Sequence, residues 1–204
     1  MNCGDVMYDN SLFFSKMAHQ KCNIIQRLGL THNRYILATI HRDNNTDDST
    51  RLTSIFRALL DIAHNEQIDI VLPLHPRTRK LLPTNLEPQT YSRLQSSKRV
   101  KLIPPASFFE IIELERNARL VMTDSGGVQK EAFFFERPCV ILRPETEWVE
   151  IVENEAGVIA DADYDRIIAG YKRLTGKSVQ FPKLFGDGRA AEHILETISD
   201  YLQR

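Results

Sequence analysis

The sequence has little of what marks secreted, membrane-embedded or metal-binding proteins. It holds three cysteines among 204 residues, an odd number without the spacing of a metal site. No apolar run approaches the roughly 20 residues that a membrane helix needs. The opening residues, MNCGDVMYDN, lack the basic and apolar regions of a signal peptide. We therefore expect a cytoplasmic protein with no membrane partner and no metal ion.

An excess of charge of one sign is also absent. Lys and Arg total 26 against 27 Asp and Glu, so the net charge is −1. Because nucleic-acid-binding domains usually carry a basic patch, we expect no nucleic-acid partner. The hydrophobic content of 42% is that of an ordinary globular chain that buries a core.

Short apolar runs alternate with longer amphipathic segments along the chain. The runs predict strands at 35–41, 68–75, 99–104, 119–124, 138–143 and 156–161. The amphipathic segments predict helices at 9–29, 51–64, 108–118, 126–136, 164–174 and 188–202. This alternation is typical of βαβ units. We therefore expect an α/β fold, a Rossmann-like parallel sheet with helices on both faces.

Charged side chains follow several of the expected strands, at the point where each strand ends. His41 and Arg42 follow the first strand, His75 the second and Arg143 the fifth. In an open parallel sheet, ligands bind outside the carboxyl ends of the strands. Either histidine alone is more often structural than functional, but the set as a whole indicates one binding rim.

The segment VMTDSGGVQKEA, residues 121–132, runs from an expected strand directly into a helix. A helix N-terminus offers unpaired N–H groups and a positive dipole end to an anion. Gly126 and Gly127 let that anion approach the backbone itself, and Ser125 either caps the helix or donates to a phosphate oxygen. Glu131, one turn deeper, suits the two hydroxyls of a ribose. Such a helix start is structural more often than not, but together with the rim it predicts a nucleoside-diphosphate site.

Four segments carry a resemblance to a known family: TIHRDNN, VLPLHPRTRK, NARLVMTDSGGVQKEAFFFERPCVILRPETEWVE and FGDGRAAEHI. They resemble the non-hydrolysing UDP-N-acetylglucosamine 2-epimerases, which have the GT-B architecture of two Rossmann-like domains facing a cleft. The likeness is to the C-terminal half only. It implies an inter-domain segment and helix at 1–30, a UDP-binding domain at 31–186, a C-terminal helix at 187–204, and a missing N-terminal Rossmann-like domain.

The resemblance also implies roles for individual residues. His41 matches the family's active-site histidine. The residues that match or lie at UDP-binding positions are Arg42, His75, Phe108, Ile111, Ser125, Gly126, Gly127, Glu131 and Arg143. Among these, Phe108 and Ile111 would pack against uracil. The implied ligand is a UDP-sugar without a cofactor, and the implied full-length enzyme is a homodimer.

The family's reaction inverts C2 of the sugar by eliminating UDP and adding it back. The base that takes the C2 proton is expected on the N-terminal domain, so we expect these 204 residues alone to bind without turnover. Asn44 stands where the family usually has glutamate in HR-x-E-N, which removes one charge from the site.

The choice of substrate and the class of function keep alternatives at this stage. Trp148 replaces the arginine of the family's Thr-Glu-Arg, and this form looks more like the branch acting on UDP-2,3-diacetamido-2,3-dideoxyglucuronate. A GT-B glycosyltransferase would share the diphosphate site, although the HR…SGG…TEW combination favours the epimerases. A stand-alone UDP-binding module without chemistry is the other alternative.

Overall fold

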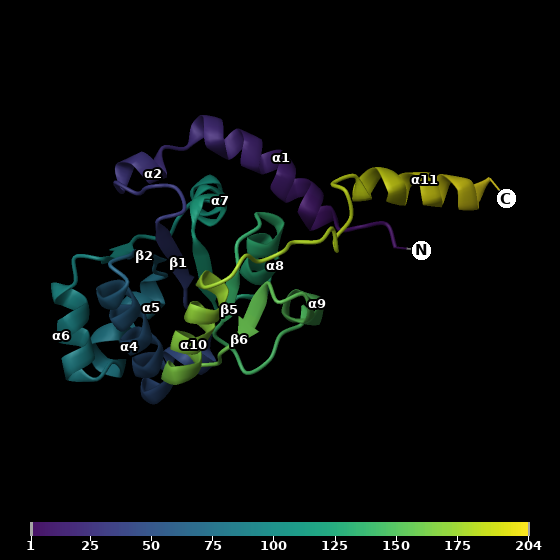
Figure 1. Cartoon of the computed structure of the whole chain (residues 1–204). Helices are drawn as coiled ribbons and strands as arrows, with labels where there is room; N and C mark the ends of the chain where they lie inside the picture. The colour runs from purple at the N-terminus through teal and green to yellow at the C-terminus, as the bar shows by residue number, and fades with distance from the viewer. Residues whose placement is uncertain (1, 204) are drawn as a thin grey trace.

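Six parallel strands form the one sheet of the computed structural model, which describes residues 2–203. The strands are β1 (Tyr35–Thr39), β2 (Asp69–Pro73), β3 (Val100–Ile103), β4 (Leu120–Thr123), β5 (Cys139–Ile141) and β6 (Gly157–Ile159). Their order across the sheet is β3-β2-β1-β4-β5-β6, and every neighbouring pair is parallel. This is the strand order of a doubly wound Rossmann fold. The predicted α/β class is confirmed (Figure 1).

Helices lie on both sides of this sheet. They are α1 (Val6–Lys21), α2 (Ile24–Arg27), α3 (Asp43–Thr46), α4 (Ser49–Asn65), α5 (Pro76–Asn85), α6 (Pro88–Ser96), α7 (Phe108–Asn117), α8 (Gly126–Phe134), α9 (Val149–Glu153), α10 (Tyr164–Thr175) and α11 (Ala190–Leu202). Alternate residues of β1 face opposite layers, as the two-residue period of a strand requires. Ile36 and Ala38 pack in the cluster of α4 and α10, whereas Tyr35 and Leu37 pack in the cluster of α2, α7 and α8. Burial on both faces explains why the strands read as continuous apolar runs.

The structure differs from the sequence-based elements at the first helix and at four short helices, α3, α5, α6 and α9. The helix predicted at 9–29 is broken at Cys22, whose backbone is extended, and this turn places Ile24 against the sheet with only 1% of its surface exposed. The patterns did not predict α5 and α6, which are polar and short. Each begins with a proline at its first position, where proline suits a helix. Pro83 inside α5 obscures the helical pattern there.

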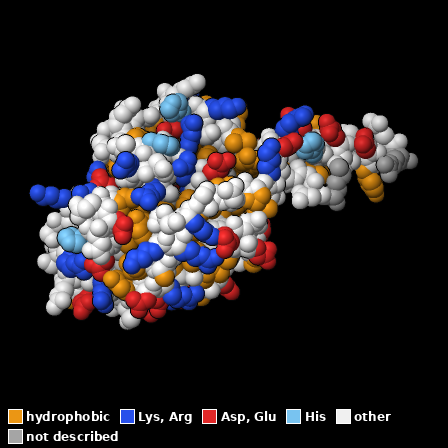
Figure 2. All heavy atoms as spheres, in the orientation of Figure 1, with side chains coloured by type: hydrophobic (Ala, Val, Ile, Leu, Met, Phe, Trp, Pro, Cys, Tyr) orange, Lys and Arg blue, Asp and Glu red, His pale blue; other side chains and the backbone are white. Residues whose placement is uncertain are grey.

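The C-terminal helix forms as predicted, but its apolar face is uncovered within residues 2–203. Asp9 of α1 accepts hydrogen bonds from the N–H groups of Ala190 (3.1 Å) and Ala191 (2.9 Å), which anchors the start of α11. The helix then projects away from the sheet (Figures 1 and 2). Of the apolar residues predicted to share one face of this helix, Ala190 is buried. The others are 37–76% exposed: Ile194, Leu195, Ile198 and Leu202.

Across residues 2–203, no helix combines the length and apolarity that crossing a bilayer requires. The same stretch contains no cluster of three or more His, Cys, Asp or Glu side chains placed to hold a metal ion.

One carboxylic acid lies inside the core, on α7. The side chain of Glu115 is completely buried, and neither of its oxygens finds a hydrogen-bond donor among the described residues. Burial, with a smaller contribution from the charge of Glu131, raises the pKa of Glu115 well above its usual value. The folded chain therefore favours the protonated acid at this position.

Because the pKa of Glu115 is raised on folding, its contribution to the free energy of unfolding is fully present below its unfolded pKa. That contribution is lost as the pH rises toward its folded pKa. Glutamine does not ionise, so we expect Glu115→Gln to melt at a higher temperature relative to the parent at pH 8 than at pH 5. The expected gain between the two pH values is a few degrees, since about 1 kcal/mol corresponds to roughly 2–4 °C in a chain of this size. Thermal melts measure it.

The matched control is Glu153→Gln, which removes an exposed carboxylate from the end of α9. Its shift should be the same at both pH values. Equal shifts for Glu115→Gln at pH 5 and pH 8 would contradict the burial of an unpaired acid.

Candidate functional site

The strand order reverses between β1 and β4, which lie side by side in the middle of the sheet. The chain winds from β1 toward β3 on one side and from β4 toward β6 on the other. Their carboxyl ends therefore border a crevice, the usual position of a ligand in this fold. The loop at 40–45 and the junction at 124–127 lie at these ends. The structure thus brings His41, Arg42 and Ser125 together.

The two central strands are tied at their ends by threonines. Thr39 and Thr123 are register partners, and their hydroxyl oxygens are 2.5 Å apart. The Thr123 hydroxyl also accepts a hydrogen bond from the N–H of Ser125 at 2.9 Å. The start of α8 is therefore fixed relative to β1 by side chains as well as by the sheet.

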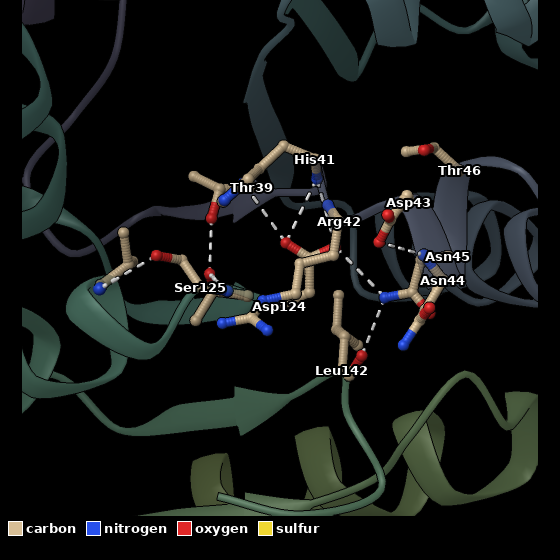
Figure 3. A network of polar contacts seen from close by, with 12 residues as sticks. Thr39, His41, Arg42, Asp43, Asn44, Asn45, Thr46, Asp124, Ser125 and Leu142 are labelled. Carbon is tan, nitrogen blue, oxygen red and sulfur yellow. Dashed lines mark hydrogen bonds and ion pairs between the residues drawn. The ribbon is translucent and has the colours of Figure 1, made fainter. Parts of the chain in front are cut away.

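A buried carboxylate holds the loop after β1. Asp124 is fully buried and accepts hydrogen bonds from the N–H of His41 (3.1 and 3.2 Å to its two oxygens) and the N–H of Arg42 (3.0 Å). The side-chain amide of Asn45 donates to the same carboxylate at 3.2 Å and to the carbonyl of Leu142 at 2.9 Å. Figure 3 shows these groups converging on Asp124. One aspartate thereby links the ends of β1, β4 and β5.

Asp124 also faces the imidazole of His41, whose Nδ1 lies 3.3 Å from Oδ1. This orients the ring of His41 at the mouth of the crevice, where half of its side-chain surface is exposed. Asp124 is not among the site residues predicted from the sequence. A signal for it does exist, because an aspartate at the end of an apolar strand must find several donors if it is buried.

The first turn of α8 is partly exposed, with Ser125 and Gly126 half-buried. The Ser125 hydroxyl accepts from the N–H of Val128 at 3.5 Å, a long capping bond. A Cβ on Gly126 would lie 3.2 Å from Oε2 of Glu147, a tight contact with the end of that side chain. Gly127 is exposed. Neither glycine has a positive φ, so backbone conformation does not require glycine at either position. At Gly126 the missing side chain instead lets the Glu147 carboxylate lie close to the backbone.

The guanidinium of Arg143 lies beside Gly126 and is paired with a carboxylate. Arg143 follows β5 and is only 9% exposed. Its Nη1 and Nη2 donate to the two oxygens of Glu147 at 2.8 and 2.6 Å. These hydrogen bonds lower the pKa of Glu147 to about 2. In the sequence, Glu147 stands out only as part of the Thr-Glu-Trp motif, and its pairing with Arg143 is visible only in the fold.

Glu131, the residue predicted to bind ribose, is half-buried on α8. Burial raises its pKa to about 7, so a group that is normally ionised at neutral pH titrates there. Ile111 of α7 is half-buried against the same core cluster as Leu114 and Ala132. Phe108, at the start of α7, is 54% exposed, and its ring packs edge-on against Phe14 of α1 with centroids 5.1 Å apart.

His75 lies after β2, on the other side of β1. Its Nδ1 accepts a hydrogen bond from the N–H of Arg77 at 3.3 Å, which makes it the N-cap of α5. Arg77 in turn donates to Thr46 at 2.9 Å and pairs with Asp47, which ties α5 to the loop after β1. The contacts that we find for His75 are thus local to its turn, and its predicted role in ligand binding stays a prediction.

Asn44, the position where a glutamate was expected, is exposed and lines a small cavity of about 120 Å³. Arg42, Arg143 and Glu145 line the same cavity, which lies between the loop after β1 and the loop after β5. With asparagine at position 44, the charged residues that line this cavity are three arginines, Arg42, Arg51 and Arg143, and one glutamate. Arg51 is paired with Asp161, and Arg143 is paired with Glu147.

The doubly wound parallel sheet, with a glycine pair at a helix start beside the β1/β4 crevice, defines a Rossmann-like domain. The chain belongs to the UDP-N-acetylglucosamine 2-epimerase family, whose model matches residues 1–199. It is 43% identical over 200 residues to the UDP-2,3-diacetamido-2,3-dideoxy-D-glucuronate 2-epimerase of Pseudomonas aeruginosa, covering 98% of this chain and 52% of that protein.

Solved structures agree with this assignment. The UDP-GlcNAc 2-epimerase of Methanocaldococcus jannaschii superposes with a TM-score of 0.88 at 31% identity, over 98% of this chain and 55% of that one. A second structure of that enzyme, in complex with UDP-GlcNAc and UDP, gives 0.85 at 31% identity, over 98% of this chain and 54% of that one. These are GT-B epimerases, and this chain corresponds to their C-terminal part. The chain spans about half the length of the curated relatives it matches.

We expect Asp124→Asn to destabilise the site, because the new N–H₂ group cannot accept hydrogen bonds. Some of the N–H groups that now donate to the Asp124 carboxylate, from His41, Arg42 and Asn45, would then have no acceptor. Leaving buried donors unsatisfied costs about 1–3 kcal/mol, so the melting temperature should fall. Amide hydrogen exchange at His41 and Arg42 should become faster than in the parent. Asp43→Asn is the control, since the exposed Asp43 in the same loop accepts from the N–H of Asn44 alone. Unchanged exchange at His41 in Asp124→Asn would show that the loop does not depend on this carboxylate.

Proposed function

We propose that this chain is the UDP-binding half of an epimerase that inverts C2 of a UDP-N-acetyl-hexosamine or its uronate. The observation that carries the proposal is the partly exposed start of α8 at the β1/β4 crevice, with Ser125, Gly126 and Gly127 beside Arg42 and Arg143. Membership of the epimerase family supports it, as does the complex of a related enzyme with UDP-GlcNAc and UDP. The remaining part of the cleft would come from an N-terminal Rossmann-like domain.

In this proposal the parts of the nucleotide lie along α8 and α7. The diphosphate binds the N–H groups of the first turn of α8, where the helix dipole favours an anion by about 0.3–1 kcal/mol. The carboxylate of Glu131 accepts hydrogen bonds from the ribose hydroxyls. Uracil packs against Ile111 and Phe108, and the exposed half of the Phe108 ring is available for that contact.

Elimination of UDP needs a base for the C2 proton and stabilisation of the charge on the departing diphosphate. This chain supplies the second function through Ser125, Arg42, Arg143 and the backbone N–H groups of α8. We propose that His41 contacts the departing diphosphate and that Asp124 positions its ring. The base is a carboxylate of the other half. The reaction is therefore shared between two domains.

Several finer assignments belong to the same proposal. The 43% identity to the Pseudomonas aeruginosa enzyme supports a diacetamido uronate as the sugar. The domain limits are 1–30, 31–186 and 187–204, which agrees with the projection of α11 from the sheet domain. A homodimeric full-length enzyme in the cytoplasm, acting in polysaccharide synthesis, follows from the resemblance to the family.

We expect this chain to bind UDP more tightly than uridine, because the diphosphate meets the helix dipole and two arginines. Isothermal titration with both ligands, at one pH and ionic strength, measures the difference. A tenfold preference corresponds to about 1.4 kcal/mol, and we expect at least that. The affinity for UDP should also fall with added salt, whereas that for uridine should not. Equal affinities for UDP and uridine would show that this chain does not bind the diphosphate.

We expect the affinity for uridine to rise between pH 6 and pH 8. Ribose binding uses the ionised form of Glu131, and its raised pKa of about 7 leaves most molecules protonated at pH 6. The fraction ionised, and with it the affinity, should increase about tenfold over this range. Uridine is the appropriate ligand because it has no phosphate that titrates there. Glu131→Gln should bind uridine weakly and without this pH dependence. A parent affinity that is flat with pH would exclude Glu131 from the ribose site.

A further inference from the structure

The carboxylate of Glu147 lies at the place where the proposed diphosphate would approach. Its Oε2 is 3.2 Å from the position that a Cβ on Gly126 would take, so it rests against the first residue of α8. The two carboxylate oxygens of Glu147 accept hydrogen bonds from the two terminal nitrogens of Arg143, at 2.6 and 2.8 Å. The site thus already contains an anion, and this anion belongs to the chain itself.

The residues on either side of Glu147 are fastened to α8. The Thr146 hydroxyl donates to Oε1 of Gln129 at 2.6 Å, and the indole N–H of Trp148 donates to the carbonyl of Gly126 at 2.8 Å. The backbone N–H of Trp148 donates to the hydroxyl of Thr146 at 3.0 Å, which closes the turn. Together these bonds aim the side chain of Glu147 at the helix start. Its position therefore follows from the local structure.

We propose that Glu147 is an internal anion that occupies the diphosphate position and must leave Arg143 when a nucleoside diphosphate binds. The inference rests on the proposed diphosphate site. In the free chain the carboxylate satisfies Arg143, which is otherwise buried. On binding, the Glu147 side chain rotates into solvent while Thr146 and Trp148 keep the turn on α8. The two phosphates then take over the donors of Arg143 and of the helix start.

Electrostatics favour exchange over joint binding. Arg143 carries one positive charge, and Glu147 cancels it. A diphosphate brings two or more negative charges to the same few ångströms, where a neighbouring like charge is costly. The side chain of Glu147 is 53% exposed, whereas that of Arg143 is 10% exposed, so the glutamate is the partner that has space to move. The arginine stays in place.

An exchange of this kind makes the site selective. Ligands without a phosphate gain nothing from Arg143, because they cannot replace the bond that it already has. Only a ligand with more charge than a carboxylate, and with room for contacts along the helix start, compensates for the loss of the internal pair. Glu147 would therefore set both the affinity and the discrimination of the diphosphate site.

The test is Glu147→Gln, which keeps the size and polarity of the side chain but removes its charge. Titrations use UDP, inorganic pyrophosphate and uridine as probes on the full 204-residue chain. We expect UDP and pyrophosphate to bind to Glu147→Gln about threefold to fivefold more tightly than to the parent, in line with the energy of a half-exposed ion pair. Uridine should bind unchanged. Glu153→Gln is the matched control, since it removes an exposed charge from the end of α9, outside the cavity that Arg143 lines, and its effect should stay within twofold.

The outcomes separate the inference from the proposed function. If the parent binds UDP and Glu147→Gln binds it equally or more weakly, Glu147 holds Arg143 for the ligand and the inference is wrong. A gain of the same size in Glu153→Gln would also overturn it, because the effect would then come from the general loss of a negative charge. If neither the parent nor Glu147→Gln binds UDP or pyrophosphate, both the inference and the proposed function are wrong.

Discussion

The need of one buried carboxylate for hydrogen-bond donors organises the crevice. Asp124 ends β4 inside the protein, and burial of an ionised group is costly unless donors surround it. The N–H groups of His41 and Arg42 and the amide of Asn45 meet that need. The loop after β1 must therefore fold over the end of β4, which places the side chains of His41 and Arg42 at the crevice. A residue that never faces the ligand thus decides where two site residues lie.

Three other carboxylates near α8 differ in charge because their surroundings differ. Glu147 is held ionised by two hydrogen bonds from Arg143, whereas burial raises the pKa of Glu131 to about 7. Glu115 lies deeper still and favours its protonated form. At neutral pH a charged carboxylate therefore lies beside the start of α8, Glu131 on that helix is about half ionised, and Glu115 on α7 favours its protonated form.

Much of the fold was predictable because local patterns and tertiary packing agree. The strands are buried on both faces, so they appear in the sequence as uninterrupted apolar runs, and the longer helices show their stripes. The helices that the patterns missed, α3, α5, α6 and α9, are short or polar and depend on their neighbours. The predicted stripe of α11 is real, but its residues Leu195 and Leu202 remain exposed. Periodicity predicts a helix and its apolar side without saying what covers that side.

The sequence by itself determined that the strands are parallel in an α/β fold, and that the segment DSGG begins a helix at a strand end. Both depend on short-range geometry, since strand and helix periods and the conformational freedom of glycine act within a few residues. Only the tertiary structure decided that β1 and β4 are neighbours, because strand order depends on the crossovers between distant segments. The contacts of His41 with Asp124 and of Arg143 with Glu147 lie at or beside that junction. The first joins residues 83 positions apart, and both depend on where the loops after β1, β4 and β5 converge in space.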